Sequence, residues 1–389
     1  MKHLLQCLGV SLWFGLFVLP AHAAFTSLYV FGDALSATTD NPDTGPYYYG
    51  QRYSNGRVWV EVLAQRQGLK FDDTKNDSYY DHNSAELVKE LINFKAPQDV
   101  STALFVVWVC NADTFDAAQN HDNSLQWTLA NTVSQSNHLL IITALYAKGV
   151  RNLVLPNAVD ISEIPAYNES NLAKVMSAGC IAYNAALANT INQARLLFPD
   201  LNIYTPDYYT LLNNVLTNPD AYGLTNALYQ KFSIDALSDP TIKSLTLNGP
   251  GTNYIFWDPQ DPTAKLHEIM ADVAQQIISP VQINGLTVFN GSNELDVVNM
   301  PVGLNGFVDG CTNLTQPNWT TVTNIAGTSP LQSLFVNAAP LPAPTAASGT
   351  GGSGSIDPNN TNNVGGTYIP PFSPAQFYRL DFPYSWSWP

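Results

Sequence analysis

The fold of this chain is decided by one stretch near its N-terminus, Ser27-Leu28-Tyr29-Val30-Phe31-Gly32-Asp33-Ala34-Leu35-Ser36. An apolar, aromatic and β-branched run leads directly into Gly-Asp, which is typical of a buried strand that ends in a tight turn. In open α/β sheets, the turns at the carboxyl ends of the strands build the functional site. We therefore predict a first strand over 28–31 and a site that begins at Asp33.

A short leader precedes this strand. Lys2 and His3 come before an apolar run over 4–19, and Ala21-His22-Ala23 places small residues at a cleavage spacing. This pattern is typical of a secretory signal peptide over 1–23, because the run is short for a membrane span and polar sequence follows. No later segment is long and apolar enough to predict a transmembrane helix. We expect an exported bacterial protein, either periplasmic or secreted.

The charge and cysteine content of the chain argue against several kinds of partner. Lys and Arg number 16 against 31 Asp and Glu, so the formal net charge is −15. An acidic chain is a poor ligand for nucleic acid or for anionic membranes. Cys7 belongs to the leader, and Cys110, Cys180 and Cys311 remain, which allows at most one disulfide and shows no metal-ligand spacing. We expect no metal, and the sequence does not indicate an oligomeric state.

Two domains are predicted after the leader. Over 24–280, short apolar runs alternate with longer helical periods, which predicts a mostly parallel sheet with helices on both faces. After residue 280, Gly, Asn, Thr, Ser and Pro dominate, and short alternating segments predict a small all-β module over 281–389 with a Gly/Ser-rich loop over 341–370. Further predicted strands lie at 104–109, 152–156 and 202–204, and predicted helices at 58–64, 127–148, 168–197 and 263–278.

Four blocks within residues 26–278 resemble the GDSL, or SGNH, hydrolase family. They are the stretch 31–36, written Phe-Gly-Asp-Ser-Leu-Ser in the family, and the segments 53–61, 104–113 and 256–263. Each block alone is weak, but their order and spacing together are specific. The resemblance implies a flavodoxin-like three-layer α/β fold, no cofactor, and small-molecule ligands such as lipid, acyl or acetylated-carbohydrate esters.

The family's catalytic residues are only partly kept. In working members a serine attacks the ester carbonyl, a histidine takes its proton, and an aspartate three residues earlier orients the histidine. The resemblance places the nucleophile at Ala34, which can neither attack nor be deprotonated. The aspartate is kept as Asp258, but the histidine position holds Asp261. Two carboxyls this close repel, so we expect one of them to have a raised pKa.

The oxyanion-binding groups are also altered. The resemblance places the family's asparagine at Ala112, within Cys110-Asn111-Ala112-Asp113. Asn111 stands one position earlier and would point the other way if the preceding strand continued. The family's oxyanion glycine would fall within 76–82, where Asp81 replaces it. Whether such a chain is an enzyme is therefore left open.

Several neighbours are further candidates for the pocket. Ser36 could replace the nucleophile, His82 could line the pocket or be structural, and His267 on the last helix suggests a surface or positioning role. The acids could form a cation site or be solvated loop residues. Loop tyrosines could bind a flat ligand face or pack under the rim: Tyr47, Tyr48, Tyr49, Tyr53, Tyr79 and Tyr80. The pocket candidates besides the family positions are Asp33, Ser36, His82, Asn111 and Asp113.

Three classes of function remain open. The first is a catalytically impaired relative of ester hydrolases that keeps the pocket for binding. The second is an active hydrolase with a rearranged site that uses Ser36 or a water activated by the acids. The third is a surface interaction protein that acts through the β module. Assays with short-chain esters separate the first two classes, and the state of the pocket beside Ala34 separates the first from the third.

Overall fold

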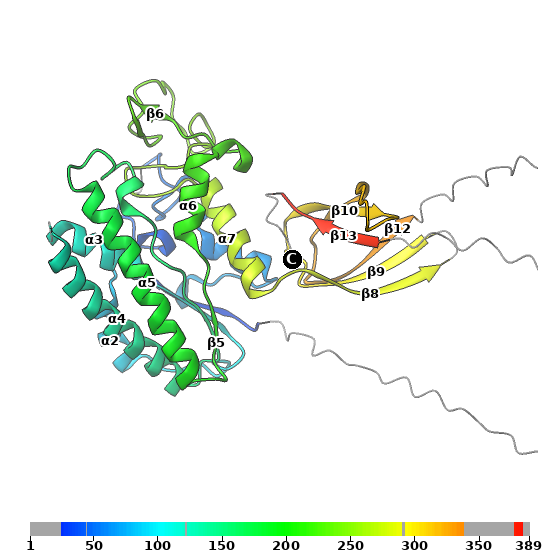
Figure 1. The fold of residues 1–389 in the computed structure, drawn as a ribbon, viewed down its shortest axis with the longest axis horizontal. Coiled ribbons are helices and arrows are strands. Elements are labelled where there is room, and N and C mark those ends of the chain that lie inside the picture. The colour runs from blue at the N-terminus through cyan, green and yellow to red at the C-terminus, as the bar shows by residue number, and fades with distance from the viewer. Residues whose placement is uncertain (1–24, 44, 121–122, 290–291, 338–376, 384–389) are drawn as a thin grey trace, which may run out of the picture.

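The structure, a computed structural model, describes residues 25–43, 45–120, 123–289, 292–337 and 377–383. A larger body of helices around a sheet is followed by a smaller body of strands (Figure 1). The predicted leader over 1–23 and the predicted Gly/Ser-rich loop over 341–370 lie outside the described residues.

A five-stranded parallel sheet forms the centre of the larger body. Its order is β2-β1-β3-β4-β5, the flavodoxin-like order in which the first strand lies inside the sheet. β3 is buried along its whole length, because a central parallel strand is covered on both faces. The predicted fold class is confirmed. The strand bounds are β1 Leu28–Gly32, β2 Asn76–Ser78, β3 Leu104–Trp108, β4 Asn152–Val154 and β5 Asn202–Tyr204.

Helices cover the sheet in two groups, which Figure 1 separates clearly. In one group α1 packs on α7, and Tyr208 of α6 donates to the Met270 carbonyl of α7 over 3.0 Å. In the other group α2, α3 and α5 all pack on α4. The helix bounds are α1 Trp59–Arg66, α2 Ser84–Asn93, α3 Cys110–Asn120, α4 Ser124–Ala147, α5 Ala173–Leu197, α6 Tyr208–Thr217 and α7 Ala264–Ile278.

Two elements were predicted with the wrong bounds, and some helices were not predicted. The strand expected over 104–109 ends at Trp108, and the chain turns into α3 at Cys110. The helix expected from residue 168 begins only at Ala173. Neither α2 nor α6 was predicted, because each is short and begins at a polar cap rather than at a strong apolar period. In α2, for example, the Asn83 side chain accepts from the backbone of Ala85 and Glu86.

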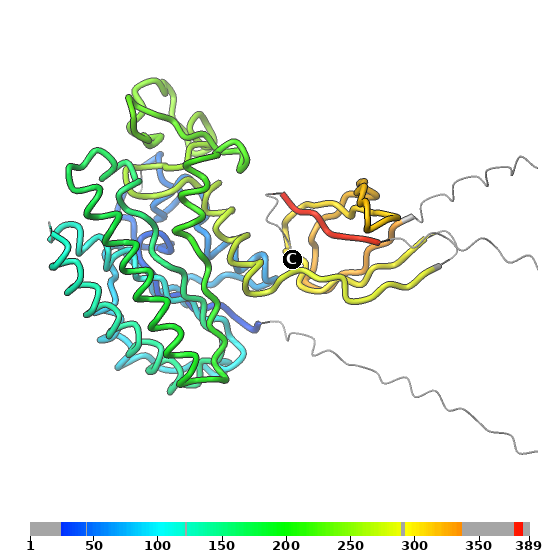
Figure 2. Tube along the Cα trace, viewed as in Figure 1, coloured from blue at the N-terminus to red at the C-terminus, as the bar shows by residue number. Residues whose placement is uncertain are grey.

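The smaller body is all β, as predicted. One antiparallel sheet has the order β12-β9-β8 and the other has the order β11-β10-β13. Figure 2 shows the chain entering this module directly from the end of α7. Alternating apolar residues such as Leu295, Val297, Val308 and Val336 form its separate core. The strand bounds are β8 Gln282–Phe289, β9 Ser292–Val298, β10 Asn305–Cys311, β11 Thr320–Ala326, β12 Leu331–Asn337 and β13 Phe377–Asp381.

A buried arginine connects the two bodies. Arg66, at the end of α1, forms a 2.6 Å ion pair with Asp272 of α7 and donates to the Val302 carbonyl of the β module over 3.2 Å. The Val302 N–H in turn donates to the Arg66 carbonyl over 3.1 Å. Because both charged side chains are buried and paired, this contact fixes where the β module meets the larger body.

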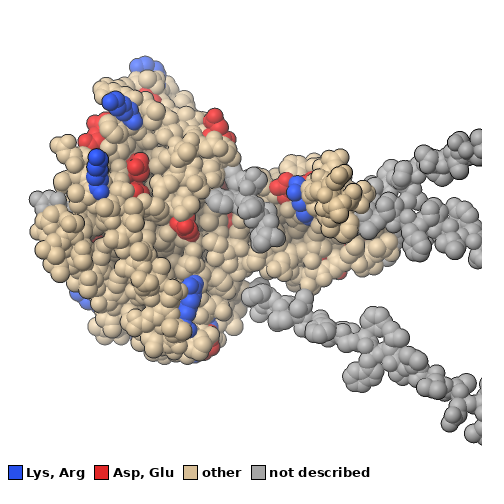
Figure 3. Space-filling view, viewed as in Figure 1, with Lys and Arg blue, Asp and Glu red and all other residues tan. Residues whose placement is uncertain are grey.

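The surface in the orientation of Figure 3 is mostly uncharged, with isolated basic and acidic side chains. Among the helices that the structure describes, none combines the length and the apolar character that a membrane span requires. Cys110, Cys180 and Cys311 are buried and unpaired with one another.

Candidate functional site

The loop after β1 is tightly built and presents Ala34. The Asp33 N–H donates to the Trp108 carbonyl of β3 over 3.1 Å, and the Asp33 carboxylate accepts from the Leu35 N–H over 3.1 Å. Gly32 must be small, because a Cβ there would lie 2.7 Å from the Cβ of Ser36. Ala34 then begins a single turn of 3₁₀ helix, Ala34–Ser36, with its methyl group half-buried.

A small pocket of about 30 Å³ opens beside Ala34. Its walls come from the loops that follow β1 and β2, from helix α3, which follows β3, and from the loop before α7, so it lies at the carboxyl edge of the sheet. The volume suits one or two water molecules or an acetyl-sized group. The residues that line it are Asp33, Ala34, Leu35, Tyr80, Asp81, Asn111, Ala112, Phe115, Gln119, Gln260 and Asp261.

Asp258 and Asp261 form a buried carboxyl pair. Asp258 Oδ1 accepts from the N–H groups of Gln260 and Asp261 at 2.9 and 2.8 Å, and its Oδ2 accepts from the Tyr48 hydroxyl at 2.9 Å. Burial, followed by the charge of Asp258 and a hydrogen bond with it, raises the pKa of Asp261 well above the usual range. Asp261 is therefore the protonated member, and the pair is held together by that proton. The expected pKa increase is confirmed, but the two acids are bonded to each other and do not only repel.

Asp33 is the second unusual acid in the pocket. Burial raises the pKa of Asp33 to about 7, and Asp113 contributes in the same direction. The Asn111 side chain lies beside this carboxyl and opposes the pKa increase, although neither Asp33 Oδ2 nor Asn111 Nδ2 has a well-aligned partner among the described residues. Asp33 therefore gains and loses a proton near neutral pH.

Asn111, one of the predicted pocket candidates, lines the pocket, because the strand that would have pointed it away does not continue. Because the strand ends at Trp108 and α3 begins at Cys110, Asn111 and Ala112 are consecutive helical residues, and both line the pocket. The Asn111 Oδ1 accepts from the Val159 N–H over 3.1 Å, which leaves the amide N–H₂ group nearest to Asp33. An amide donor is thus kept in the pocket one position before the family's asparagine.

Asp81 occupies a backbone conformation that favours glycine. Its φ is 65°, and side chains other than Asn, Asp and Gly are rare in this left-handed region. This conformation agrees with the loose alignment that places the family's oxyanion glycine here. Tyr80 and Gln260 lie close together across the pocket, where their contact lowers the pKa of Tyr80 against the larger increase that burial causes.

Two predicted candidates serve the core and do not line the pocket. The Ser36 side chain is fully buried, and its hydroxyl accepts from the Trp59 indole N–H over 3.0 Å. Asp113 accepts from the Ser84 N–H at 2.9 Å and from the Tyr183 hydroxyl at 2.7 Å, and it lies 3.3 Å from His138. Ser36 is thus unsuited to attack a substrate, and Asp113 ties α3 to three neighbouring helices.

The two candidate histidines are also structural. His82 is buried between the Gly32 carbonyl, 3.1 Å from Nδ1, and the Glu90 carboxylate, 3.1 Å from Nε2. His267 was expected to have a surface or positioning role, but it is buried inside α7, where its Nδ1 accepts from the Trp59 N–H at 3.3 Å. Burial lowers the pKa of His267 to about 3, so this ring is neutral and cannot supply the missing base function.

The loop tyrosines divide between the site and its surroundings. Tyr48 is bonded to Asp258, Tyr80 lines the pocket, and the Tyr53 hydroxyl donates to Asp40 over 3.0 Å. The Tyr79 hydroxyl instead donates to Glu90 over 2.7 Å. The side chains that the structure describes include no cluster of three or more His, Cys, Asp or Glu arranged to hold a metal ion.

Sequence reasoning missed part of the pocket wall. Phe115 and Gln119 line the pocket one and two turns after Asn111 on α3. The spacing i, i+4, i+8 would have identified them if α3 had been predicted as a helix. Gln260 belongs to the block 256–263, and only the lack of a family role for this position left it unnamed.

Comparisons with known proteins identify the family. The family model described as GDSL-like lipase/acylhydrolase matches residues 28–274. A GDSL esterase/lipase of Arabidopsis thaliana is 24% identical over 332 residues, which cover 66% of this chain and 87% of that relative. The chain therefore belongs to the GDSL-like lipase/acylhydrolase family.

Solved structures with a similar fold include two hydrolases. An alpha/beta hydrolase enzyme from the metagenome of Lake Arreo, Spain, is 12% identical, with 67% of this chain and 98% of that chain covered and a TM-score of 0.40. A variant of an acetyl xylan esterase from Geobacillus stearothermophilus is 13% identical, with 65% and 94% covered and a TM-score of 0.38.

Proposed function

We propose that this protein is an exported, catalytically impaired member of its family that keeps the pocket beside Ala34 as a binding site for the acyl part of an ester. The observation that carries the proposal is the pairing of two losses in one pocket: a methyl group at the nucleophile position and the protonated Asp261 at the base position. Export rests on the leader pattern over 1–23.

The chemistry of the pocket supports impairment. Ala34 cannot form an acyl-enzyme, and a carboxyl that already holds a proton cannot accept one from a nucleophile. In a well-studied serine protease, loss of one member of the triad already removes about six orders of magnitude in rate. A second loss adds little, since only electrostatic help to water remains.

The pocket also supports a small acyl group as the ligand. Phe115 and the Ala34 and Ala112 methyl groups provide apolar wall, and the Asn111 amide is a donor for a carbonyl oxygen. With a volume of about 30 Å³, the pocket would take an acetyl group more readily than a long chain.

The test uses the full mature chain with short-chain nitrophenyl esters and a serine-reactive phosphonate. We expect no turnover above buffer and no covalent adduct, together with saturable binding of a non-hydrolysable acetyl ester analogue that Ala34→Phe abolishes by filling the pocket. Robust turnover, or an adduct at Ser36, would contradict impairment. Binding that Ala34→Phe leaves unchanged would contradict the pocket assignment.

A second candidate function is favoured by Asp33. With a pKa of about 7 and a cavity large enough for water beside it, Asp33 could take a proton from water while the hydroxide attacks an ester carbonyl. The protonated Asp261 could then donate to the leaving alkoxide. This function predicts slow turnover that rises with pH through about 7 and is lost in Asp33→Asn, whereas the impaired protein shows no turnover at any pH.

A further inference from the structure

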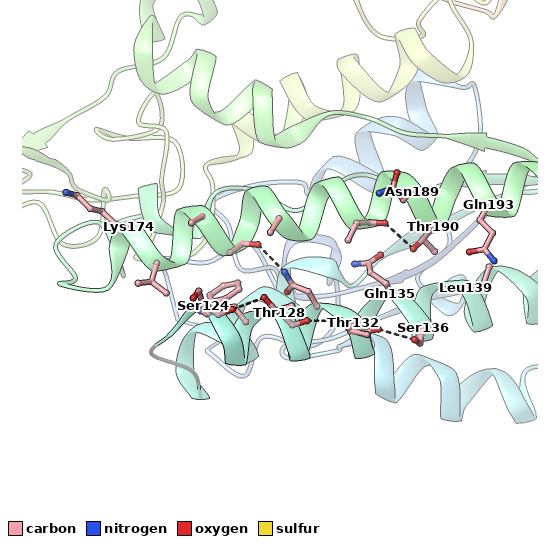
Figure 4. A pocket seen from close by; sticks show the side chains of 17 residues that line it. Ser124, Thr128, Thr132, Gln135, Ser136, Leu139, Lys174, Asn189, Thr190 and Gln193 are labelled. Carbon is pink, nitrogen blue, oxygen red and sulfur yellow. Dashed lines mark hydrogen bonds between the residues drawn. The ribbon is translucent and has the colours of Figure 1, made fainter.

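A second cavity, about 680 Å³ in volume, lies between α4 and α5. All of its lining residues belong to these two helices, and none of them lines the pocket beside Ala34. Figure 4 shows the cavity as a groove that follows both helix axes. A volume of this size accommodates an organic ligand larger than an acetyl group.

Small residues on α5 create the space. Ala178, Ala182 and Ala186 follow one another at four-residue intervals and line the groove, so they lie on one face of α5. The next residue after Ala178, Gly179, packs directly against α4, because a Cβ there would lie 2.2 Å from the ring of Trp127. The groove is therefore built into the helix pair and does not result from a long side chain in an open rotamer.

The opposite wall is less polar than its sequence suggests. The hydroxyls of Thr128, Thr132 and Ser136 on α4 each donate to the carbonyl four residues earlier, at 2.8, 2.8 and 3.0 Å. Their donors are therefore already used, as the dashed lines of Figure 4 show. Methyl and methylene groups are left to form the wall, and an apolar ligand can contact them without losing hydrogen bonds.

Two donors belong to groove-lining residues but are buried beneath the groove surface, and neither has an acceptor among the described residues. The Trp127 indole N–H belongs to a side chain that is 2% exposed, and it has no partner among the described residues. The Gln135 amide is 9% exposed, and its contact with the Tyr183 hydroxyl is too poorly aligned to satisfy either amide atom. Because neither nitrogen has accessible surface, a ligand in the groove would not contact these donors, and they do not contribute to its recognition.

The charge of the groove selects the sign of the ligand. In a chain with a net charge of −15, the described lining contains no Asp or Glu, and Lys174 is its one charged side chain. Lys174 lies at the same end as Ser124, whereas Leu139 and Gln193 lie at the other end (Figure 4). An anionic head group therefore belongs at the Lys174 end, about 24 Å of helix from Thr190.

An exposed apolar rim continues the groove. Leu125, Leu129, Val133 and Leu140 of α4 are 67%, 60%, 60% and 55% exposed. Each follows directly on a residue that lines the groove, so the four lie along one side of it. Such a row of exposed large apolar side chains on one helix is typical of a surface that contacts an apolar partner.

We propose that this groove binds a free long-chain carboxylate, with its head group at the Lys174 end and its chain along Ala178, Ala182 and Ala186. The length, the apolar walls and the single cation all fit a fatty acid, and none of these three features is explained by the pocket at Ala34. The proposal does not depend on the proposed function, because the two cavities share no residue.

The first test measures binding to the full mature chain by displacement of cis-parinaric acid, a fluorescent fatty acid. We expect palmitate to displace it in a saturable manner, and octanoate to be at least about tenfold weaker, because each buried methylene contributes about 0.8 kcal/mol. Equal affinities for the two acids, or no saturable binding of the fluorescent acid, would overturn the proposal.

The second test locates the ligand. Ala182→Leu fills the groove and should abolish palmitate binding, whereas Ala188→Leu, on an exposed part of α5 outside the groove, should leave it unchanged. Lys174→Gln should weaken palmitate by about tenfold but leave the matching alcohol, cetyl alcohol, unaffected. Circular dichroism confirms that each variant is folded. Binding that survives Ala182→Leu, or that is indifferent to Lys174→Gln, would show that the acid binds elsewhere on the chain.

Discussion

The pocket beside Ala34 and the groove between α4 and α5 are opposite in character. The pocket is small, lies at the carboxyl edge of the sheet and contains the protonatable groups Asp33 and Asp261. The groove is more than twenty times larger by volume, about 680 against about 30 Å³, and Lys174 is the one charged residue in its described lining. The family's chemistry would need the first site, and a large ligand would need the second.

Under the proposed function, this difference teaches that the reacting groups can be replaced while the scaffold around them remains. The turn after β1, the left-handed backbone at Asp81 and the tight loop around Asp258 all persist, because they are held by backbone hydrogen bonds and by sheet geometry. The reacting groups are single side chains, and their replacement by Ala34 and Asp261 leaves that backbone intact. Under the proposed function, this chain keeps the family's fold without the family's reaction.

The sharpest way to break the comparison is to restore the chemistry of the pocket. Ala34→Ser alone should remain inactive, because Asp261 cannot hold a proton as histidine does near neutral pH. Ala34→Ser with Asp261→His and Ala112→Asn should hydrolyse short-chain nitrophenyl esters at least about a thousandfold faster than the parent. The control is the same triple variant with Gly in place of Ser at position 34. If Ala34→Ser alone were active, Asp261 would have to be a competent base.

A second, smaller effect is the pH dependence of stability. Native Asp33 holds a proton up to about pH 7, whereas in the unfolded chain it does so only below about 3.8. The contribution of Asp33 to the free energy of unfolding is therefore fully present below about pH 3.8. It is lost as the pH rises through about 7, with a slope of about 1.4 kcal/mol per pH unit. Urea unfolding across this range should show Asp33→Asn flattening the decrease in the free energy of unfolding by about that slope.

The exposed Asp77 of β2 provides the matched control for this measurement. Asp77→Asn should leave the pH dependence of unfolding as it is in the parent. A slope that Asp33→Asn does not change would mean that Asp33 is ionised in the folded protein, and it would remove the basis for the water-activating function.

A side chain added where α5 packs against Trp127 should lower the free energy of unfolding by about 1–3 kcal/mol. Gly179→Ala would stabilise an ordinary helix, yet here its Cβ meets the Trp127 ring at 2.2 Å, so we expect the free energy of unfolding to fall. Trp127→Leu in the same chain should relieve the clash, which a double-mutant cycle of urea unfolding would measure. Additive effects of the two substitutions would contradict the close approach of α4 and α5 at this point.

The sequence predicted the parts of the fold that carry strong periodic or continuous apolar signals. β1 and β3 are continuous apolar runs at the centre of the core, and α4 and α7 add apolar residues to it at helical spacing. It did not predict α3, since Cys110-Asn111-Ala112-Asp113 follows a buried strand directly and its buried polar residues hide the helical period. For that reason the sequence could give the orientation of Asn111 only for the case in which the strand continued.

The sequence predicted which catalytic groups of the family are replaced, but it did not predict how the neighbouring side chains are buried. Ala34, Ala112 and Asp261 could be placed by alignment of short blocks, and the structure brings all three to one pocket. The burial of Ser36 and of His267 could not be predicted, because it depends on Trp59, which contacts both from a separate helix. The groove had no sequence signal at all, since alanines and threonines on helices are ordinary surface residues until two such helices pair.

The smallest expected effect tests whether the groove contacts its ligand through apolar or through polar groups. In Thr132→Val the side chain keeps its shape but loses the hydroxyl that donates to the Thr128 carbonyl. Because that hydroxyl is already used within α4, we expect palmitate affinity to stay within about twofold of the parent or to rise, and the free energy of unfolding to change by less than about 0.5 kcal/mol.

Thr143→Val removes an equivalent hydroxyl bond farther along α4, outside the groove, and corrects for any change in helix stability. Displacement of cis-parinaric acid by palmitate measures the affinity of both variants. A tenfold loss confined to Thr132→Val would mean that the hydroxyl turns to the ligand, and that the groove recognises its ligand through polar contacts along the chain.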